Sequence, residues 1–189
     1  METYRIFDSE LEKLTTKVVQ MCSQVDLQVN DALTALKEYD LKLAKKVISN
    51  DKEIDTLDVK IDRLCQKIFA LQQPVASDLR YILSALKINN DLERVGDHAV
   101  NIAKRIAPLE DYRELISELG VEKVGNETSL LFSEILELVK THDLKICTEV
   151  YQLSAIVKEG CHEIADKILT EMMHKSEVVV VAAGGGVGI

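Results

Sequence analysis

The sequence is poor in residues that interrupt helices and in long apolar runs. It has no tryptophan, three phenylalanines and two prolines among 189 residues, a composition that suits long helices. No run of 18 uncharged residues exists, so we expect no membrane-spanning segment. The first residues also lack the apolar stretch of a signal peptide, and we therefore expect a cytoplasmic protein without direct membrane insertion.

The sequence also lacks closely spaced cysteine pairs, and its basic residues are fewer than its acidic ones. The four cysteines show no Cys-x-x-Cys spacing, and we expect them to be buried, reduced thiols, as in a cytosolic chain. The net charge of -9 argues against binding to a nucleic-acid backbone and against attraction to anionic lipids. Any association with a membrane would then go through another protein. The cysteines are Cys22, Cys65, Cys147 and Cys161.

What the sequence does have is apolar residues at intervals of three and four, the spacing of packed helices. Three such stripes predict three helices, with turns near Tyr39 and Asp40 and at residues 72–74, where Pro74 is tolerated as a first helical residue. The prediction is an antiparallel three-helix bundle. The stripes are Leu11, Leu14, Val18, Met21, Val25, Ala32 and Leu36; then Ala44, Val47, Ile54, Ile61, Cys65 and Ile68; then Leu79, Ile82, Leu86, Glu93, Val100 and Ala103.

Acidic residues occupy positions in these stripes where apolar residues belong. In a hairpin centred near residue 73, Asp51 and Asp55 lie opposite about residues 95 and 91, at the level of Glu93 and Asp97. We therefore expect four carboxylates to converge in one buried layer. Buried, unpaired carboxylates need a cation, a metal ion or a hydrogen-bond donor.

Three further polar residues extend this expected layer. Asp58 also occupies a stripe position, Asn101 follows Asp97 by four residues, and Gln28 interrupts the first stripe at about the level of Asp51. Gly96 lies inside the same segment and suggests a close approach of two backbones beside the acids.

Carboxylate oxygens in this number suit magnesium, manganese, calcium or iron better than zinc or copper, which prefer nitrogen and sulfur ligands. Two alternatives remain open. In the first, the acids are neutralised by Arg94, Arg63 and lysines or lie at a solvated rim of the bundle. In the second, they serve a metal-free adaptor in which the polar layer only sets helix register. A di-iron enzyme is disfavoured because the two Glu-x-x-His pairs, Glu159 to His162 and Glu171 to His174, lie about 18 Å apart on one helix.

Two segments, residues 71–80 and 91–103, resemble the PhoU family of phosphate-uptake regulators. The metal motif of that family, an acid followed four residues later by Asp, is matched by Glu93 and Asp97, and Asp51 with Asp55 has the same form. The resemblance implies an all-α protein of two similar three-helix bundles, usually a homodimer, that binds a metal ion or cluster. The candidate metals are iron, manganese, magnesium and zinc, and no catalysis is implied.

The resemblance also implies a negative regulator of phosphate-starvation signalling, which links the phosphate ABC transporter to a sensor histidine kinase. On this reading the metal ligands are Asp51, Asp55, Glu93 and Asp97. Accessory ligands would be Asn101, Asp58 and Gln28, and Arg94 is a candidate partner contact.

An internal repeat divides the chain. The segment at residues 40–47 reappears at residues 143–150 with four identities in eight positions, but Asp51 maps to Ser154 and Asp55 to Lys158. We expect a first bundle at residues 1–106, a connection at 107–125, and a partial second bundle at 126–177 that begins a helix at Asn126 and lacks its last helix. Residues 178–189 contain no polar side chain, and we interpret them as the result of a truncation, a frameshift or an uncertain sequence assignment.

Overall fold

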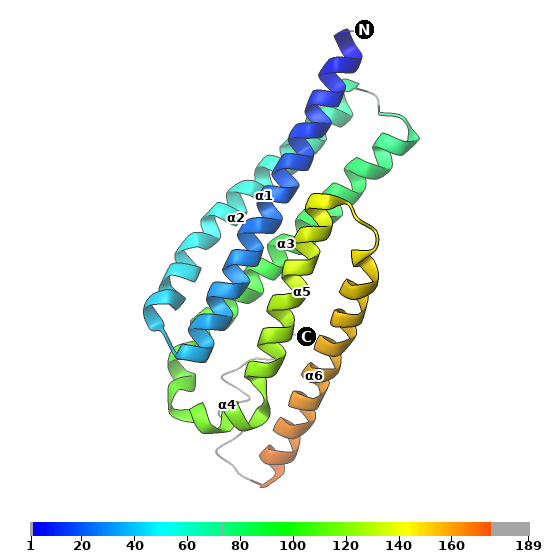
Figure 1. Ribbon diagram of the computed structural model, residues 1–189. Coiled ribbons are helices and arrows are strands. Elements are labelled where there is room, and N and C mark those ends of the chain that lie inside the picture. The colour runs from blue at the N-terminus through cyan, green and yellow to red at the C-terminus, as the bar shows by residue number, and fades with distance from the viewer. Residues whose placement is uncertain (1, 73, 175–189) are drawn as a thin grey trace.

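The computed structural model describes residues 2–72 and 74–174, and every regular element in them is helical (Figure 1). This confirms the prediction of an all-α fold. In chain order the elements are α1 (Glu2–Glu38), α2 (Leu41–Gln72), α3 (Ala76–Leu109), the short 3-10 turn η1 (Glu110–Tyr112), α4 (Arg113–Leu119), α5 (Val121–Thr141) and α6 (Ile146–His174).

The three long helices α1, α2 and α3 pack together as an antiparallel bundle around an apolar core (Figure 1). The predicted stripe of α2 is buried throughout, and the stripe of α1 is buried or partly buried at every position. The stripe of α3 differs, because Leu79 is exposed and the buried positions run through Asn89, Leu92 and Gly96. The largest fully buried apolar side chains are Leu14, Met21, Ile54, Ile61, Ile68, Ile82 and Ile106.

The turn between α1 and α2 lies where the sequence predicts it. Tyr39 adopts the left-handed conformation, with a φ of 56°. The Asp40 side chain then caps α2, since its Oδ1 accepts hydrogen bonds from the backbone N–H groups of Lys42 at 2.8 Å and Leu43 at 3.0 Å. At the other end, α3 begins at Ala76, so Pro74 precedes the helix and is not its first residue.

The hairpin of α5 and α6 repeats this turn 103 residues later. His142 also has a φ of 56°, and the Oδ1 of Asp143 accepts a hydrogen bond from the backbone N–H of Lys145 at 3.0 Å. The internal repeat seen in the sequence is therefore a repeat of structure, with α5 in the role of α1 and α6 in the role of α2.

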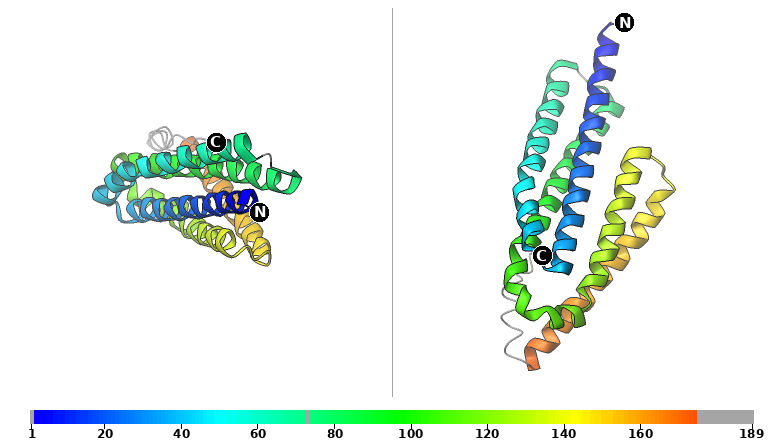
Figure 2. Two further views of the ribbon diagram at one scale, coloured as in Figure 1. Left: turned by 90° about the horizontal axis from the view of Figure 1, so that it is seen from above. Right: turned by 60° about the vertical axis from the view of Figure 1, so that its left-hand side comes forward.

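The hairpin lies along one side of the bundle, with α5 beside α1 and α6 on the outer side (Figures 1 and 2). Lys37 and Glu122 form an ion pair of 2.5 Å across this contact, and the Ser129 hydroxyl donates to the Asn30 side chain. The α5 side chains that pack against the core of the bundle are Phe132, Ile135, Leu136 and Val139.

The connection between the two units is shorter and more helical than expected. The helix α3 continues to Leu109, and α5 begins at Val121, so the predicted helix start at Asn126 is wrong by five residues. The reason is Gly120, whose φ of 83° ends α4 and allows α5 to begin at once. Gly125 lies inside α5, where a Cβ would meet the Leu33 side chain of α1 at 3.4 Å.

No helix among the described residues is long and apolar enough to cross a membrane. The second unit, as described, consists of the α5/α6 hairpin with α4 at its end, and α5 has no buried residue. The apolar segment 178–189 lies outside the described residues.

Candidate functional site: an acidic cluster between α2 and α3

A buried glutamine links all three helices of the bundle. Gln28 is 5% exposed, and its Nε2 donates to Asp51 Oδ1 at 3.1 Å and to the Gly96 carbonyl oxygen at 3.3 Å. Because Gln28, Asp51 and Gly96 come from α1, α2 and α3, the predicted polar layer does cross the bundle. The level of Gln28 with Asp51 is confirmed.

Gly96 brings α2 and α3 close together at this level. A Cβ at this position would lie 3.2 Å from Ile54 Cδ1 and 3.9 Å from Asp51 Oδ1. The first distance is shorter than an ordinary van der Waals contact, so a side chain here would force the neighbouring isoleucine to shift. The close approach expected from this glycine is confirmed.

A second buried amide lies one level along the bundle, and the sequence analysis missed it. Asn89 is fully buried, and its Nδ2 donates to Asp58 Oδ1 at 2.6 Å and to the Asp58 carbonyl oxygen at 3.3 Å. Its own Oδ1 has no hydrogen-bond partner among the described residues. A signal was present in the sequence, because Asn89 follows Ile82 and precedes Gly96 by seven residues each, which places all three on one helix face.

The predicted acids lie at the rim of this layer and not inside it. Glu93 is half-buried, whereas Asp55, Asp97 and Asn101 are exposed. The buried face of α3 runs through Leu92 and Gly96, and the position after Leu92 is rotated by about 100° from it. The expectation that these carboxylates face inward is therefore wrong. We call the five neighbouring acids the acidic cluster: Asp51, Asp55, Asp58, Glu93 and Asp97.

The acids of the cluster repel one another. The pKa of Asp55 is raised by partial removal from water and by the charges of Asp51, Asp97 and Asp58. The pKa of Glu93 is raised in the same way, first by burial and then by the charges of the other four acids, led by Asp97. The two helices therefore bring their acids near enough to interact, as the hairpin register predicts.

Within the described ranges, the acids of the cluster have no cationic partner. Arg94 lies 4.0 Å from Asp91, which is outside the acidic cluster, and both side chains are largely exposed. None of the ion pairs among the described residues involves an acid of the cluster. Neutralisation by arginine and lysine, one of the alternatives, is therefore not what the described part of the chain shows.

The acidic cluster fits an oxygen-liganded cation in charge and chemistry, but it is not preformed for one. Its donors are carboxylates, the ligands that magnesium, manganese and iron prefer. In the described ranges, however, no three acidic, histidine or cysteine side chains lie close enough together to hold a metal ion. Binding would require the exposed carboxylates to change rotamer.

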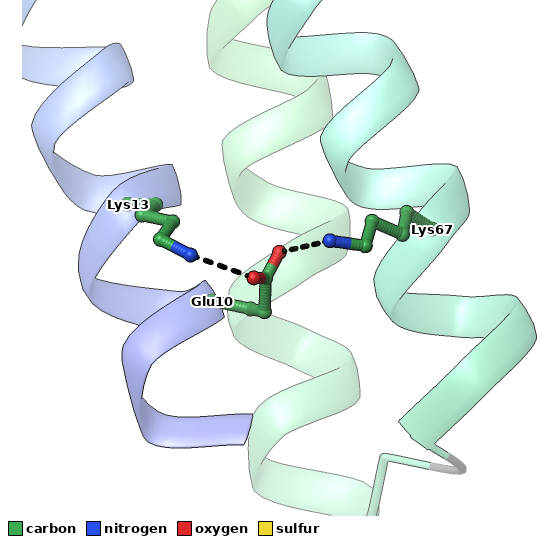
Figure 3. Close-up of polar contacts among 3 residues, drawn as sticks. All are labelled: Glu10, Lys13 and Lys67. Carbon is green, nitrogen blue, oxygen red and sulfur yellow. Dashed lines mark hydrogen bonds and ion pairs between the residues drawn. The ribbon is translucent and has the colours of Figure 1, made fainter. Parts of the chain in front are cut away.

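A contrasting acid lies towards the other end of the bundle. Glu10 is 6% exposed, and its two oxygens accept from Lys13 Nζ at 2.8 Å and Lys67 Nζ at 3.0 Å (Figure 3). These hydrogen bonds lower the pKa of Glu10. This acid is fully paired and joins α1 to α2, so its role is structural.

The remaining candidate ligands do not form a site. Both Glu-x-x-His pairs lie on α6, as expected, which leaves the di-iron alternative without a second helix. Cys22 and Cys65 are buried, and burial raises the pKa of each to about 11. Cys147 and Cys161 are exposed, so the expectation of four buried thiols is wrong for the two on α6.

Comparisons with known proteins agree with this architecture. The chain matches the family model described as PhoU domain over residues 18–106, which include the second half of α1, all of α2 and most of α3. The phosphate-specific transport system accessory protein PhoU of Escherichia coli (strain K12) is 33% identical over 175 residues, covering 92% of this chain and 72% of that protein. A homologue from Clostridium acetobutylicum is 34% identical over 180 residues, covering 93% and 81%.

Solved structures give the same result. The chain is similar to the crystal structure of PhoU from Pseudomonas aeruginosa, with a TM-score of 0.82 and 30% identity over 95% of this chain and 86% of that one. It is also similar to the phosphate transport system regulatory protein PhoU from Streptococcus pneumoniae, with a TM-score of 0.78 and 25% identity over 89% and 80%. The chain therefore belongs to the PhoU family.

Proposed function

We propose that this protein is a cytoplasmic regulator of phosphate uptake and phosphate-starvation signalling that acts by binding other proteins and catalyses no reaction. The observation that carries the proposal is the match over about nine-tenths of the chain to proteins named as accessory proteins of the phosphate-specific transport system. Its partners would be the phosphate ABC transporter and a sensor histidine kinase, with the protein restraining the signal when phosphate is plentiful.

The acidic cluster would hold a cation through Asp51, Asp55, Glu93 and Asp97, with Asp58, Asn101 and Gln28 as accessory groups. The uncompensated charge of the cluster supports this, because a bound cation would remove the repulsion that raises the pKa of Asp55 and Glu93. When bound, iron, manganese, magnesium or zinc would supply positive charge and no reaction. The acids themselves would then order the surface of α2 and α3 that a partner contacts.

A metal-free adaptor is the second candidate, and two hydrogen bonds favour it. Asp51 and Asp58 already accept from the amides of Gln28 and Asn89. These bonds fix the register of the helices without any ion. In that case the exposed acids, Asp55 and Asp97, would serve protein contact alone.

Metal content distinguishes the two candidates. Inductively coupled plasma mass spectrometry would be run on the native chain and on Asp51→Ala/Glu93→Ala, both purified without chelator. Asp91→Ala is the matched control, because this exposed acid lies on α3 outside the cluster. Cation binding predicts at least one equivalent in the native and control chains and loss in the double variant; absence from all three supports the adaptor.

The regulatory role needs a separate test in cells. A strain lacking its own regulator would carry a phosphate-regulated reporter and receive either the native chain or Glu93→Ala/Asp97→Ala, at equal protein levels. The native chain should restore repression in high phosphate. A native chain that restores nothing contradicts the regulatory role, whereas full repression by the variant contradicts only a role of the acidic cluster in signalling.

A further inference from the structure

A cavity lies where the first bundle meets α4 and α5. Its volume is about 220 Å³, roughly the share of seven water molecules in the liquid. Its lining comes from the last turns of α1, from α4 and from the first turns of α5. Figure 1 shows these three segments at the same end of the first bundle. Small-molecule sites occur preferentially at such junctions between packed units.

Part of the cavity lining is apolar. Leu33 and Leu36 contribute to it from α1, Ile116 from α4 and Val121 from α5. All four side chains are half-buried, so packing against the rest of the protein covers each of them only in part. Gly125 also lines the cavity and adds no side chain to fill it. These residues suit the carbon part of a small ligand.

Two cations line the same cavity, Lys37 on α1 and Arg113 on α4. The Arg113 guanidinium carbon lies 4.1 Å from the centre of the Tyr39 ring. A guanidinium stacked on an aromatic ring keeps the N–H groups at its edge available for a carboxylate or a phosphate. Glu122 is the single acid among the described residues of the lining. The cavity is therefore locally cationic in a chain with a net charge of -9.

Each of these cations has a carboxylate partner, but the pairs lie at the surface. Lys37 Nζ lies 2.5 Å from Glu122 Oε1, and an Arg113 nitrogen lies 2.9 Å from Glu110 Oε1. All four side chains are at least half exposed. Exposed ion pairs of this kind contribute little to stability. An anion that contacts both cations inside the cavity can therefore replace the two carboxylates at little cost in free energy.

Neutral polar side chains complete the lining. Thr34, Ser117 and Asn126 come from α1, α4 and α5, one from each element. Within the described ranges their side chains form no hydrogen bond with the protein. Their hydroxyl and amide groups are therefore free to donate to the oxygen atoms of a ligand.

We propose that this cavity binds a small organic oxyanion, either a carboxylate or a phosphate monoester. The oxyanion contacts Arg113 and Lys37, and the carbon part of the ligand lies against Leu33 and Ile116. Because α1 belongs to the first bundle and α4 leads to the hairpin, the ligand joins the two units. A ligand that binds only when they are in contact stabilises that contact. The inference is independent of the proposed regulatory role and of the acidic cluster.

Isothermal titration calorimetry on the full chain tests the ligand class. The probes are benzoate and phenyl phosphate, with phenol as the neutral analogue and inorganic phosphate as the oxyanion without a carbon part. We expect the better of the two probes to bind with a dissociation constant of about 1 mM or lower. This probe identifies which oxyanion the cavity prefers. Phenol and inorganic phosphate should bind at least roughly tenfold more weakly.

Two variants locate the binding site. Arg113→Gln removes the charge beside the Tyr39 ring, and Ser117→Phe fills the cavity but leaves both cations in place. Each should raise the dissociation constant at least roughly tenfold. Arg80→Gln is the matched control, because Arg80 is exposed near the start of α3, whereas the cavity lies beyond the end of that helix. It should bind the probe as the native chain does.

Hydrogen exchange of the native chain locates the ligand without any substitution. The bound probe should slow exchange in residues 113–126 and leave the middle of α2 unchanged. Three results would overturn the proposal: no binding of either probe, equal binding of phenol or inorganic phosphate, or protection confined to residues away from the cavity. Binding that Ser117→Phe leaves intact, in a variant with a native circular dichroism spectrum, would overturn it as well.

Discussion

Glu10 and Glu93 are the same amino acid in the same bundle, yet their surroundings act on them in opposite directions. Glu10 accepts hydrogen bonds from two lysines, which lower its pKa. Glu93 is partly removed from water and has four acidic neighbours, and both effects raise its pKa. The charged form of Glu10 therefore stabilises the folded protein, whereas the charged form of Glu93 destabilises it relative to the protonated form.

These opposite shifts predict opposite effects of replacement by glutamine, measured as free energies of unfolding in the presence of a chelator. At pH 7, Glu10→Gln should destabilise the protein by about 1 kcal/mol, a modest value because the two lysines are more than half exposed. Glu93→Gln should stabilise it by roughly 0.3 kcal/mol, since it removes like-charge repulsion. Urea denaturation at pH 7 measures both.

The pH dependence separates these effects from simple loss of packing. The contribution of Glu10 is present above its unfolded pKa, near 4.5, and is lost as the pH falls through the lower folded value. The penalty from Glu93 appears as the pH rises through its raised folded pKa and is absent below about 4.5. Both differences from the native chain should therefore vanish at low pH. A constant difference at every pH would contradict the electrostatic account.

At the scale of elements, the two hairpin turns are built alike but are capped to different degrees. Asp40 accepts from two backbone N–H groups at the start of α2, whereas Asp143 accepts from one before α6 and is exposed. Asp40→Ala should lower the free energy of unfolding by about 1 kcal/mol and Asp143→Ala by less than half of that. Thermal melting of the two variants makes the comparison, and equal losses would contradict it.

The helices of the first bundle were predictable because apolar residues recur along α1 and α2 with few interruptions. The inward face of α3 was predictable only in part. Its buried positions include Asn89 and Gly96, which a pattern of apolar residues does not include. The predicted stripe therefore contained Glu93, whereas the buried residue is its neighbour Leu92. A buried amide and a close helix contact are tertiary features, and they override the local pattern.

The membership of the acidic cluster could be predicted, but its burial could not. Antiparallel register depends only on the turn position, and this placed the acids of α2 and α3 at one level. Whether Glu93 faces the core or its rim depends on a rotation of about 100°, one residue of the helix. The start of α5 was missed because Gly125 resembles a loop residue, although it lies inside the helix beside the Leu33 side chain.

At the scale of the whole molecule, the two units have very different cores. The first bundle encloses fully buried side chains from all three helices, whereas α5 has no buried residue. Hydrogen exchange should therefore be slowest in the middle of α1, α2 and α3 and faster in the outer turns of α6. Mass spectrometry of deuterated peptides measures this, and equal protection of α2 and α6 would contradict it.

Gln28 and Asn89 have a consequence for which structures the chain avoids. In a bundle with purely apolar contacts between its helices, one helix could shift by seven residues along another. Two helical turns later it would present nearly the same apolar surface to its neighbour. Such a slip here would separate the two buried amides from their aspartate partners and leave the amides unsatisfied in the interior, at a cost of several kcal/mol. Only one alignment of α2 with α3 is therefore low in free energy, and this alignment places the acids of the two helices side by side. The neutral amides inside the bundle thus decide where its surface charge is concentrated.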